Sequence, residues 1–285
     1  MRPIFVVIAS TLACVVASVM MMRRIFRRVA RWGIRVRPGG GELSSRDKVL
    51  LRYQDGEFHP LFFAWCKTWR DAMFDELPGL LSRAGNVKVF LDLGCGFGVA
   101  GAFLLEQFTG AEIYGVDPSP ERVKGAQAAW GKRGHALIGA APDFEAEEFP
   151  PRFDAVFSLD MVHYLDDAAL DLTLSRIRRR LDEGKYLILR APMLPMGSGS
   201  LIWKLTRIHY RAWGLFSQHR TEAQLRERIE KAGFAVEESR ISGGNPELRW
   251  FVSVAVPLQQ EVEGLVAEPV AAMGDDRKQD HRQHD

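Results

Sequence analysis

Hydrophobic and polar positions along the chain follow two alternating periods. Short apolar runs, rich in Val, Ile, Leu and Phe, have the length of buried β-strands. These runs cover residues 88–93, 112–117, 136–139, 154–159 and 185–191. Between several of them, apolar residues recur every three or four positions, as in an amphipathic helix. These helical stretches cover residues 98–108, 119–131 and 166–181. Strands that alternate with helices predict a parallel, doubly wound α/β sheet.

The pattern changes after this alternating region. Residues 221–232 predict a helix capped at Thr221, and two further strands follow at 234–241 and 248–256. Two strands this close in sequence can pair antiparallel at a sheet edge. The body therefore predicts a mostly parallel, seven-stranded sheet with an antiparallel edge strand. Residues 258–285 are largely polar and predict a disordered tail.

Residues 46–84 precede the first strand and predict one or two helices. They carry a stripe of aromatic side chains, for which two interpretations remain open. The side chains either pack in the core or line a substrate pocket. They are Phe58, Phe62, Phe63, Trp65, Trp69 and Phe74.

The N-terminal region has the character of a membrane anchor. Residues 3–22 contain no charged residue. At ~1.5 Å per residue, a helix of this length spans roughly 30 Å, about the hydrocarbon thickness of a bilayer. Seven arginines follow within residues 23–37, and such a cluster stays on the cytoplasmic side. We expect a transmembrane anchor over residues 1–22, a basic segment with a Gly-rich linker over 23–41, and a cytoplasmic body held at the inner membrane by one span.

Two alternatives to a spanning anchor remain open. Val15-Val-Ala17 is a passable cleavage context, so the apolar run could be a signal peptide, although the arginines that follow it oppose translocation. Met20, Met21 and Met22 are also plausible start sites. A chain that begins there keeps the basic segment, whose apolar residues recur at helical spacing and favour binding to an anionic membrane surface. The N-terminal element is therefore a transmembrane or an interfacial helix.

The net charge of +2 conceals an uneven distribution. Arg2 and the seven arginines supply eight positive charges, so the rest of the chain has a net charge of −6. An acidic body does not fit a nucleic-acid binder, whose positive charge would line a groove of the fold. Cys14, Cys66 and Cys95 lie far apart, without a Cys/His cluster. We therefore expect neither a disulfide framework nor a metal site.

Candidate chemistry is concentrated where the first strand of the alternating region ends. Residues 91–98 read Leu-Asp-Leu-Gly-Cys-Gly-Phe-Gly, and Asp117 ends the next strand. An acid, a glycine loop and a second acid in a βαβ unit are typical of a nucleotide-type cofactor site. The run from Gly96 to Gly101 also matches the dinucleotide fingerprint G-x-G-x-x-G. An NAD(P)-dependent oxidoreductase is therefore one alternative.

Asp92 favours a different cofactor. It stands directly before the glycines, where the pyrophosphate of a dinucleotide would lie close to a helix N-terminus. A carboxylate at that point repels phosphate and attracts an ammonium group. S-adenosylmethionine carries an ammonium and a sulfonium and has no phosphate, so the charge of Asp92 favours it.

Four blocks of the sequence, taken in order, resemble the class I S-adenosylmethionine-dependent methyltransferases. The blocks are residues 91–98 for the first motif, 115–119 for the second, 153–165 for the fourth strand and its loop, and 221–234 for the last helix and strand. The resemblance covers roughly residues 46–256. It implies a Rossmann-like methyltransferase domain over residues 42–257.

The resemblance implies a role for each matching position. The glycines let the backbone approach the methionine part of the cofactor, Asp92 holds its amino group, and Asp117 binds the two ribose hydroxyls. At one point the chain departs from the family, because Gly139 is followed by Ala140 where many members have an acid. Asp143 then either binds the adenine amino group or caps a turn. The expected cofactor-binding residues are Asp92, Gly94, Cys95, Gly96, Gly98, Asp117, Pro118, Asp143, Phe144 and Leu159.

Methyl transfer from a sulfonium is an in-line displacement that depends mainly on alignment. A general base is needed only if the acceptor loses a proton. His163 is the first candidate because the pKa of histidine lies near working pH; a packing role is the alternative. Residues 193–220 begin with glycines and serines and continue with apolar residues, which predicts a mobile lid over the acceptor. The candidate catalytic residues are Asp160, His163, Tyr164, His209 and Tyr210.

The expected anchor and the apolar lid favour a small or hydrophobic, lipid-like acceptor at the membrane, methylated on oxygen or carbon. No nucleic-acid or metal partner is expected. Besides the oxidoreductase, a second alternative remains open, a catalytically silent cofactor-binding module of a membrane-associated biosynthetic complex.

Overall fold

The computed structural model describes Arg24 and residues 43–257. The positions left out of that range are residues 196, 198, 213 and 215 and the side chains of Ile202, Thr206 and His209. The expected anchor, nearly all of the basic segment and the tail at 258–285 lie outside the described residues and remain predictions. Within the described part of the chain, no helix combines the length and the apolar character needed to cross a bilayer.

The body is built on one seven-stranded sheet with the order β3-β2-β1-β4-β5-β7-β6. Strands β1 to β5 are parallel, and β7 runs antiparallel to both β5 and β6. The predicted α/β sheet is confirmed. The closing pair differs in one detail, because the antiparallel strand lies one position inside the edge and β6 forms the edge itself. The strands are β1 (Val89–Leu93), β2 (Glu112–Asp117), β3 (Gly134–Ile138), β4 (Phe153–Leu159), β5 (Leu181–Pro192), β6 (Phe234–Ser242) and β7 (Asn245–Ala255).

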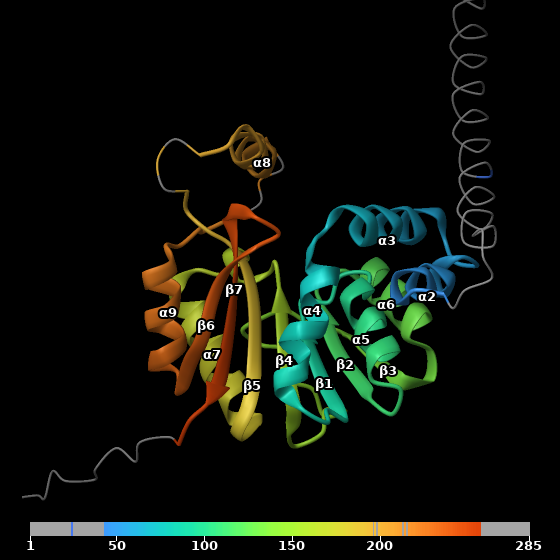
Figure 1. Cartoon of the computed structure of the whole chain (residues 1–285), viewed down its shortest axis with the longest axis horizontal. Helices are drawn as coiled ribbons and strands as arrows, with labels where there is room; N and C mark the ends of the chain where they lie inside the picture. The colour runs from blue at the N-terminus through green and yellow to red at the C-terminus, as the bar shows by residue number, and fades with distance from the viewer. Residues whose placement is uncertain are drawn as a thin grey trace, which may run out of the picture.

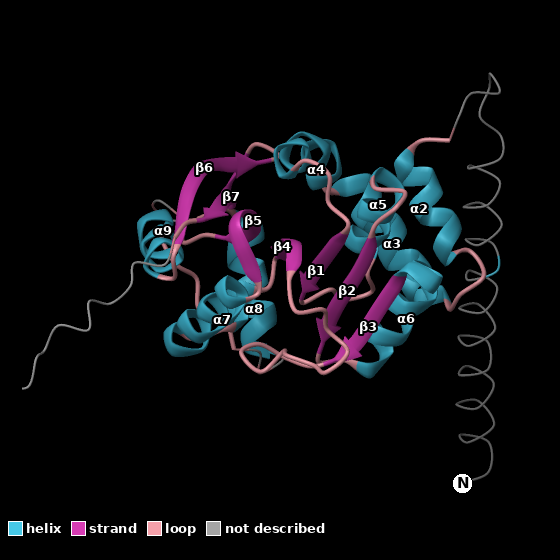
Figure 2. Cartoon of the chain, turned by 90° about the horizontal axis from the view of Figure 1, so that it is seen from below, coloured by secondary structure: helices cyan, strands magenta, loops and turns pink. Residues whose placement is uncertain are grey.

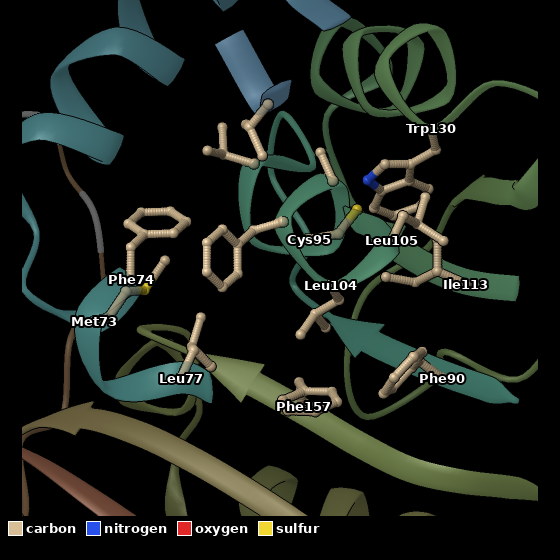
Figure 3. Close-up of a cluster of buried hydrophobic side chains, with 14 of the residues drawn as sticks. Met73, Phe74, Leu77, Phe90, Cys95, Leu104, Leu105, Ile113, Trp130 and Phe157 are labelled. Atoms are coloured by element: carbon tan, nitrogen blue, oxygen red, sulfur yellow. The ribbon is translucent and has the colours of Figure 1, made fainter. Parts of the chain in front are cut away.

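Helices cover both faces of the sheet (Figures 1 and 2). Helices α4, α5 and α6 pack on one face, where the larger hydrophobic cluster lies (Figure 3). Helices α7 and α9 pack on the other face, over a second cluster. The two faces explain the near-continuous apolar character of the central strands, which are buried on both sides. These helices are α4 (Met73–Leu81), α5 (Val99–Gln107), α6 (Pro120–Trp130), α7 (Asp167–Arg179) and α9 (Glu222–Lys231).

Within residues 43–88, three helices precede the sheet, where one or two were expected over residues 46–84. Helix α2 (Ser45–Tyr53) begins at a capping box formed by Ser44 and Asp47. Helices α3 (Phe58–Arg70) and α4 follow it. Their aromatic side chains divide between the two interpretations left open above. Phe74 is 3% exposed and packs in the first cluster, whereas Phe63 lines a cavity.

Trp130, the last residue of α6, fills the space behind the cofactor loop. Its indole Nε1 donates a hydrogen bond to the carbonyl oxygen of Gly98 at 2.8 Å. A Cβ added to Gly98 would lie 2.7 Å from the same indole nitrogen, and one added to Gly115 would lie 2.4 Å from the ring. Gly101 and Gly134 face the ring in the same way. The missing side chains at these glycines therefore make room for one tryptophan.

Between β5 and α9 the chain leaves the sheet and returns to its starting point. Helix α8 (Leu201–Ala212) lies in this excursion, clear of the sheet and beyond the end at which the parallel strands terminate (Figure 1). Met193 and Arg220 pair as a parallel bridge at its base. The Leu194 backbone N–H donates to the Arg220 carbonyl oxygen at 2.9 Å, and the Met193 N–H donates to the Glu247 carbonyl oxygen at 2.8 Å.

Candidate functional site

A cavity of about 470 Å³ lies at the carboxyl ends of β1, β2 and β4. Open α/β sheets bind their ligands at this end of the strands, and the volume of the cavity is typical of a small-molecule site. Seven of the ten expected cofactor residues line this cavity, and Gly98, Asp143 and Phe144 do not. The seven are Asp92, Gly94, Cys95, Gly96, Asp117, Pro118 and Leu159.

The glycine loop is held in shape by the end of β2. The backbone N–H groups of Gly94 and Cys95 both donate to the carbonyl oxygen of Val116, at 2.9 and 3.0 Å. Asp117 is 4% exposed, and its carboxylate accepts from the Gly96 N–H at 3.0 Å and from the Ser119 N–H at 2.9 Å. The acid that ends β2 thus fixes the loop as well as facing the cavity.

Asp92 is the most unusual group in the site. It is 2% exposed, and its Oδ2 has no hydrogen-bond partner among the described residues. Burial, with a smaller contribution from the negative charge of Asp117, raises the pKa of Asp92 to about 7. A buried carboxylate without a partner is unfavourable in the protein alone. It suits a ligand that brings a positive charge into the cavity, as an ammonium would.

The three glycines of the loop meet different neighbours. Gly94, Gly96 and Gly98 all have positive φ, at 80°, 56° and 75°, a region that side chains disfavour. A Cβ on Gly94 would lie 2.5 Å from the Met161 side chain, whereas one on Gly96 would meet nothing within 4 Å. Gly98 packs against Trp130, as described above. Gly94 and Gly98 therefore make room for protein side chains, Met161 and the Trp130 indole, and the expectation that the three glycines let the cofactor approach stays a prediction.

The expectation for Asp143 and Phe144 is also corrected. The Asp143 carboxylate accepts a hydrogen bond from Arg176 of α7 at 2.5 Å, and its side chain is 80% exposed. Phe144 is 1% exposed in the second hydrophobic cluster. The chain turns back at this point, with Ala140 and Asp143 paired in a bridge. The cavity is instead bordered by Gly139, Ala140 and Ala141.

Asp160 lines the cavity and belongs to an ion network at its wall. Its carboxylate binds Arg190, with a 2.9 Å hydrogen bond from Nε, and Lys67, with Nζ at 3.0 Å. Arg190 also forms a bidentate pair with Asp71, at 2.5 and 2.7 Å. Although burial opposes ionisation, Lys67 and Arg190 hold the pKa of Asp160 below its usual range. A carboxylate that is ionised and paired in this way is a weak base, so the structure does not support Asp160 as the general base.

Three of the other candidates come together in a cluster of rings. The Nε2 atom of His163 lies 3.2 Å from the Tyr210 hydroxyl, and the Tyr164 hydroxyl donates to the same oxygen at 3.4 Å. Tyr164 lines the cavity, and His163, which is 3% exposed, does not. Burial lowers the pKa of His163 to about 4, so its ring is neutral at working pH. The side chain of His209 lies outside the described residues.

The network around Asp160 could be foreseen only in part from the sequence. Arg190 interrupts an apolar strand run, and a charge within a buried strand requires a partner. The identity of that partner was not accessible, because Asp71 lies 119 positions away along the chain. Lys67 carries no sequence signal of its own. No cluster of three or more metal-binding side chains occurs within the described part of the chain, and the expectation of no metal remains a prediction.

Comparison with known protein families covers this part of the chain. A sequence profile described as a methyltransferase domain matches residues 91–186, which contain the glycine loop, Asp117 and Asp160. The chain carries a methyltransferase domain over these residues. The ammonium group of S-adenosylmethionine, the cofactor expected from the sequence, fits the unpartnered carboxylate of Asp92. No curated protein sequence matches the chain.

Solved structures share the fold of the methyltransferase. A phosphoethanolamine N-methyltransferase of Haemonchus contortus superposes with a TM-score of 0.54 at 20% identity, covering 75% of this chain and 61% of that one. Human N-acetylserotonin methyltransferase, in complex with S-adenosylmethionine, superposes with a TM-score of 0.53 at 16% identity, covering 75% of this chain and 57% of that one. The mitomycin 7-O-methyltransferase MmcR superposes with a TM-score of 0.53 at 18% identity, covering 72% of this chain and 60% of that one. The chain thus spans about three fifths of the length of these proteins.

Proposed function

We propose that the methyltransferase transfers the methyl group of S-adenosylmethionine to oxygen or carbon of a small hydrophobic acceptor held at the inner membrane. The observation that carries the acceptor class is the apolar part of the cavity lining. Besides the polar cofactor residues, the cavity is bordered by aromatic and aliphatic side chains. These are Phe63, Met73, Leu159, Met161, Tyr164 and Leu165.

In this proposal the cofactor is oriented by the two acids of the loop. Asp92 accepts from the ammonium of S-adenosylmethionine, and Asp117 accepts from the ribose hydroxyls with the carboxylate that also binds Gly96. The apolar lining excludes water and places the acceptor atom in line with the methyl group. Such alignment and desolvation account for most of the rate of a methyl transfer.

Two of the candidate bases that the structure describes are weak. Asp160 is paired with two cations, and neutral His163 is a poor proton acceptor because its pKa is lowered to about 4. This favours an acceptor that is nucleophilic without help, such as an ionised phenol or enol oxygen or an electron-rich carbon. Solved structures of the same fold include both an O-methyltransferase and an N-methyltransferase. The methylated atom is read from the product of the transfer assay.

A second pocket, of about 410 Å³, adjoins the cavity and shares Phe63 and Lys67 with it. It is formed by the end of α3 and by the turn between β6 and β7. Arg70 lines this pocket, so an acceptor with an anionic end would find a cation there. We assign this pocket to the part of the acceptor that does not react.

Calorimetry with S-adenosylhomocysteine tests the cofactor site. Asp117→Asn removes the charge that faces the ribose and weakens binding by about tenfold or more, since hydrogen bonds to charged groups contribute about 1.5–3 kcal/mol. Asp143→Asn is the matched control, an exposed acid outside the cavity, and leaves the affinity unchanged. Equal affinities for the two variants, or tight binding of NADH instead, contradict the assignment of the site.

Transfer of a radiolabelled methyl group into a membrane extract of the native host tests the acceptor class. We expect label in the lipid fraction. Label found only in protein or RNA contradicts the hydrophobic acceptor. Cofactor binding without any transfer favours the silent cofactor-binding module.

A further inference from the structure

Helix α8 presents an apolar stripe away from the body of the protein. Leu201, Leu205 and Ile208 are 72%, 55% and 61% exposed. At about 100° per residue, these three positions fall within roughly 60° of one another around the helix axis. A contiguous row of large exposed aliphatic side chains is unusual on a soluble surface and indicates a binding face.

The opposite side of α8 is already occupied. Trp203 and Tyr210 lie about 180° around the helix from the stripe, by the same helical periodicity. The Trp203 ring packs edge-on against His219, with 6.2 Å between the ring centroids, and the Tyr210 hydroxyl contacts His163. Because this inner face holds the helix to the body, the outer stripe cannot turn inward without breaking these contacts. Its occupant must come from outside the fold.

The charge of α8 indicates what that occupant is. The helix carries Lys204, Arg207 and Arg211 and contains no acidic residue. Arg207 lies over the Trp203 ring, 4.8 Å from its centroid. An amphipathic helix with aliphatic side chains on one face and cations beside them is typical of a helix that lies in the interface of an anionic bilayer.

Helix α3 also indicates that this end of the protein faces a bilayer. It lies with α8 beyond the carboxyl end of the sheet (Figure 1), and like α8 it contains no acidic residue. Trp69 on this helix is 64% exposed, and tryptophan favours the boundary between lipid and water. Along the chain, α2 and α3 come directly after the arginine-rich segment at residues 23–37.

We propose that α8 lies on an anionic membrane surface, with Leu201, Leu205 and Ile208 among the lipid headgroups, and that the cavity thereby opens toward the bilayer. The evidence for docking is the exposed apolar stripe and the cations of α8. The role that we give to docking, the entry of a membrane-borne acceptor past Tyr164, rests on the proposed function. Tyr164 lines the cavity and contacts Tyr210 of α8, so the docked helix adjoins the site.

A fluorescent reporter on the full chain tests the docking separately from the N-terminal segment. Leu205→Cys, in a background with Cys14 and Cys66 replaced by Ser, is labelled with an environment-sensitive dye. The chain is bound to vesicles of phosphatidylcholine and phosphatidylglycerol that contain brominated lipid. We expect a blue-shifted, strongly quenched dye at position 205. Leu172→Cys is the matched control: Leu172 is 41% exposed on α7, and its dye stays in water.

The charge dependence gives a second measurement. Vesicles of phosphatidylcholine alone, or the added pair Lys204→Glu and Arg211→Glu, should reduce quenching at position 205 several-fold. Equal quenching at positions 205 and 172 on anionic vesicles overturns the docking. Energy transfer between labels at position 205 in lipid-free samples shows that a second copy covers the stripe, and also overturns it. Affinity for S-adenosylhomocysteine, measured on the same samples, reports the proposed function independently.

Discussion

Asp92→Asn should stabilise the cofactor-free protein while it weakens cofactor binding. The carboxyl group is 2% exposed and its pKa is raised to about 7, whereas a carboxyl in an unfolded chain titrates near ~3.9. Between these two pH values the folded protein holds a proton that the unfolded chain has released. The free energy of unfolding therefore falls as pH rises from about 4 to about 7, and the loss is fully present above pH 7.

The size of the effect follows from the difference of about three pKa units. At ~1.36 kcal/mol per unit, the ionised Asp92 destabilises the cofactor-free protein by about 4 kcal/mol at pH 8. Asparagine has the same shape and does not ionise. We expect the gain in stability of Asp92→Asn over the native chain to increase by about 3 kcal/mol between pH 5 and pH 8.

Urea unfolding of the full chain in mild detergent, followed by tryptophan fluorescence, measures this difference at each pH. Asp143→Asn serves as the control, because its exposed carboxylate should give no such pH dependence. With the native chain, affinity for S-adenosylhomocysteine should fall about tenfold for each pH unit below 7, since the ammonium binds the ionised carboxylate. A stability difference that does not change with pH, or a variant less stable at pH 8, refutes the reasoning.

Three further outcomes are expected. Gly115→Ala should lower the free energy of unfolding by about 1–3 kcal/mol, because its Cβ meets the Trp130 ring; thermal melts should show that the loss is smaller when Trp130 is replaced by Leu in the same chain. Arg190→Met leaves the Asp160 carboxylate without its main partner and should destabilise by about 3–5 kcal/mol in urea; Asp160→Asn in the same chain should recover part of this. His163→Asn should leave the shape of the pH profile of kcat unchanged between pH 6 and 9, since the ring is already neutral. Loss of the rising or falling part of that profile in the variant would contradict this.

The parts of the fold that follow from local pattern were predictable from the sequence. Apolar runs placed the strands, and helical periodicity placed α5, α6, α7 and α9 to within a few residues. The glycine loop and its two acids could be placed at one edge of the sheet because parallel strands end together. The charge argument at Asp92 depends only on that placement.

The remaining features depend on contacts between distant parts of the chain. Asp160 was a plausible base by position, and only the structure shows it paired with Lys67 and Arg190. Asp143 was a candidate for binding the adenine amino group because of its position after β3. The turn that follows β3 instead directs its side chain toward Arg176. The role of Gly98 was likewise concealed, since Trp130 lies 32 positions further along the chain.

The excursion that carries α8 begins and ends at one point of the sheet, where Met193 and Arg220 pair. Because its two ends are held together by the sheet, its length and composition can change with little effect on the strands below. Replacement or loss of residues 194–219 would therefore leave the donor site, built from β1 and β2, with the same geometry.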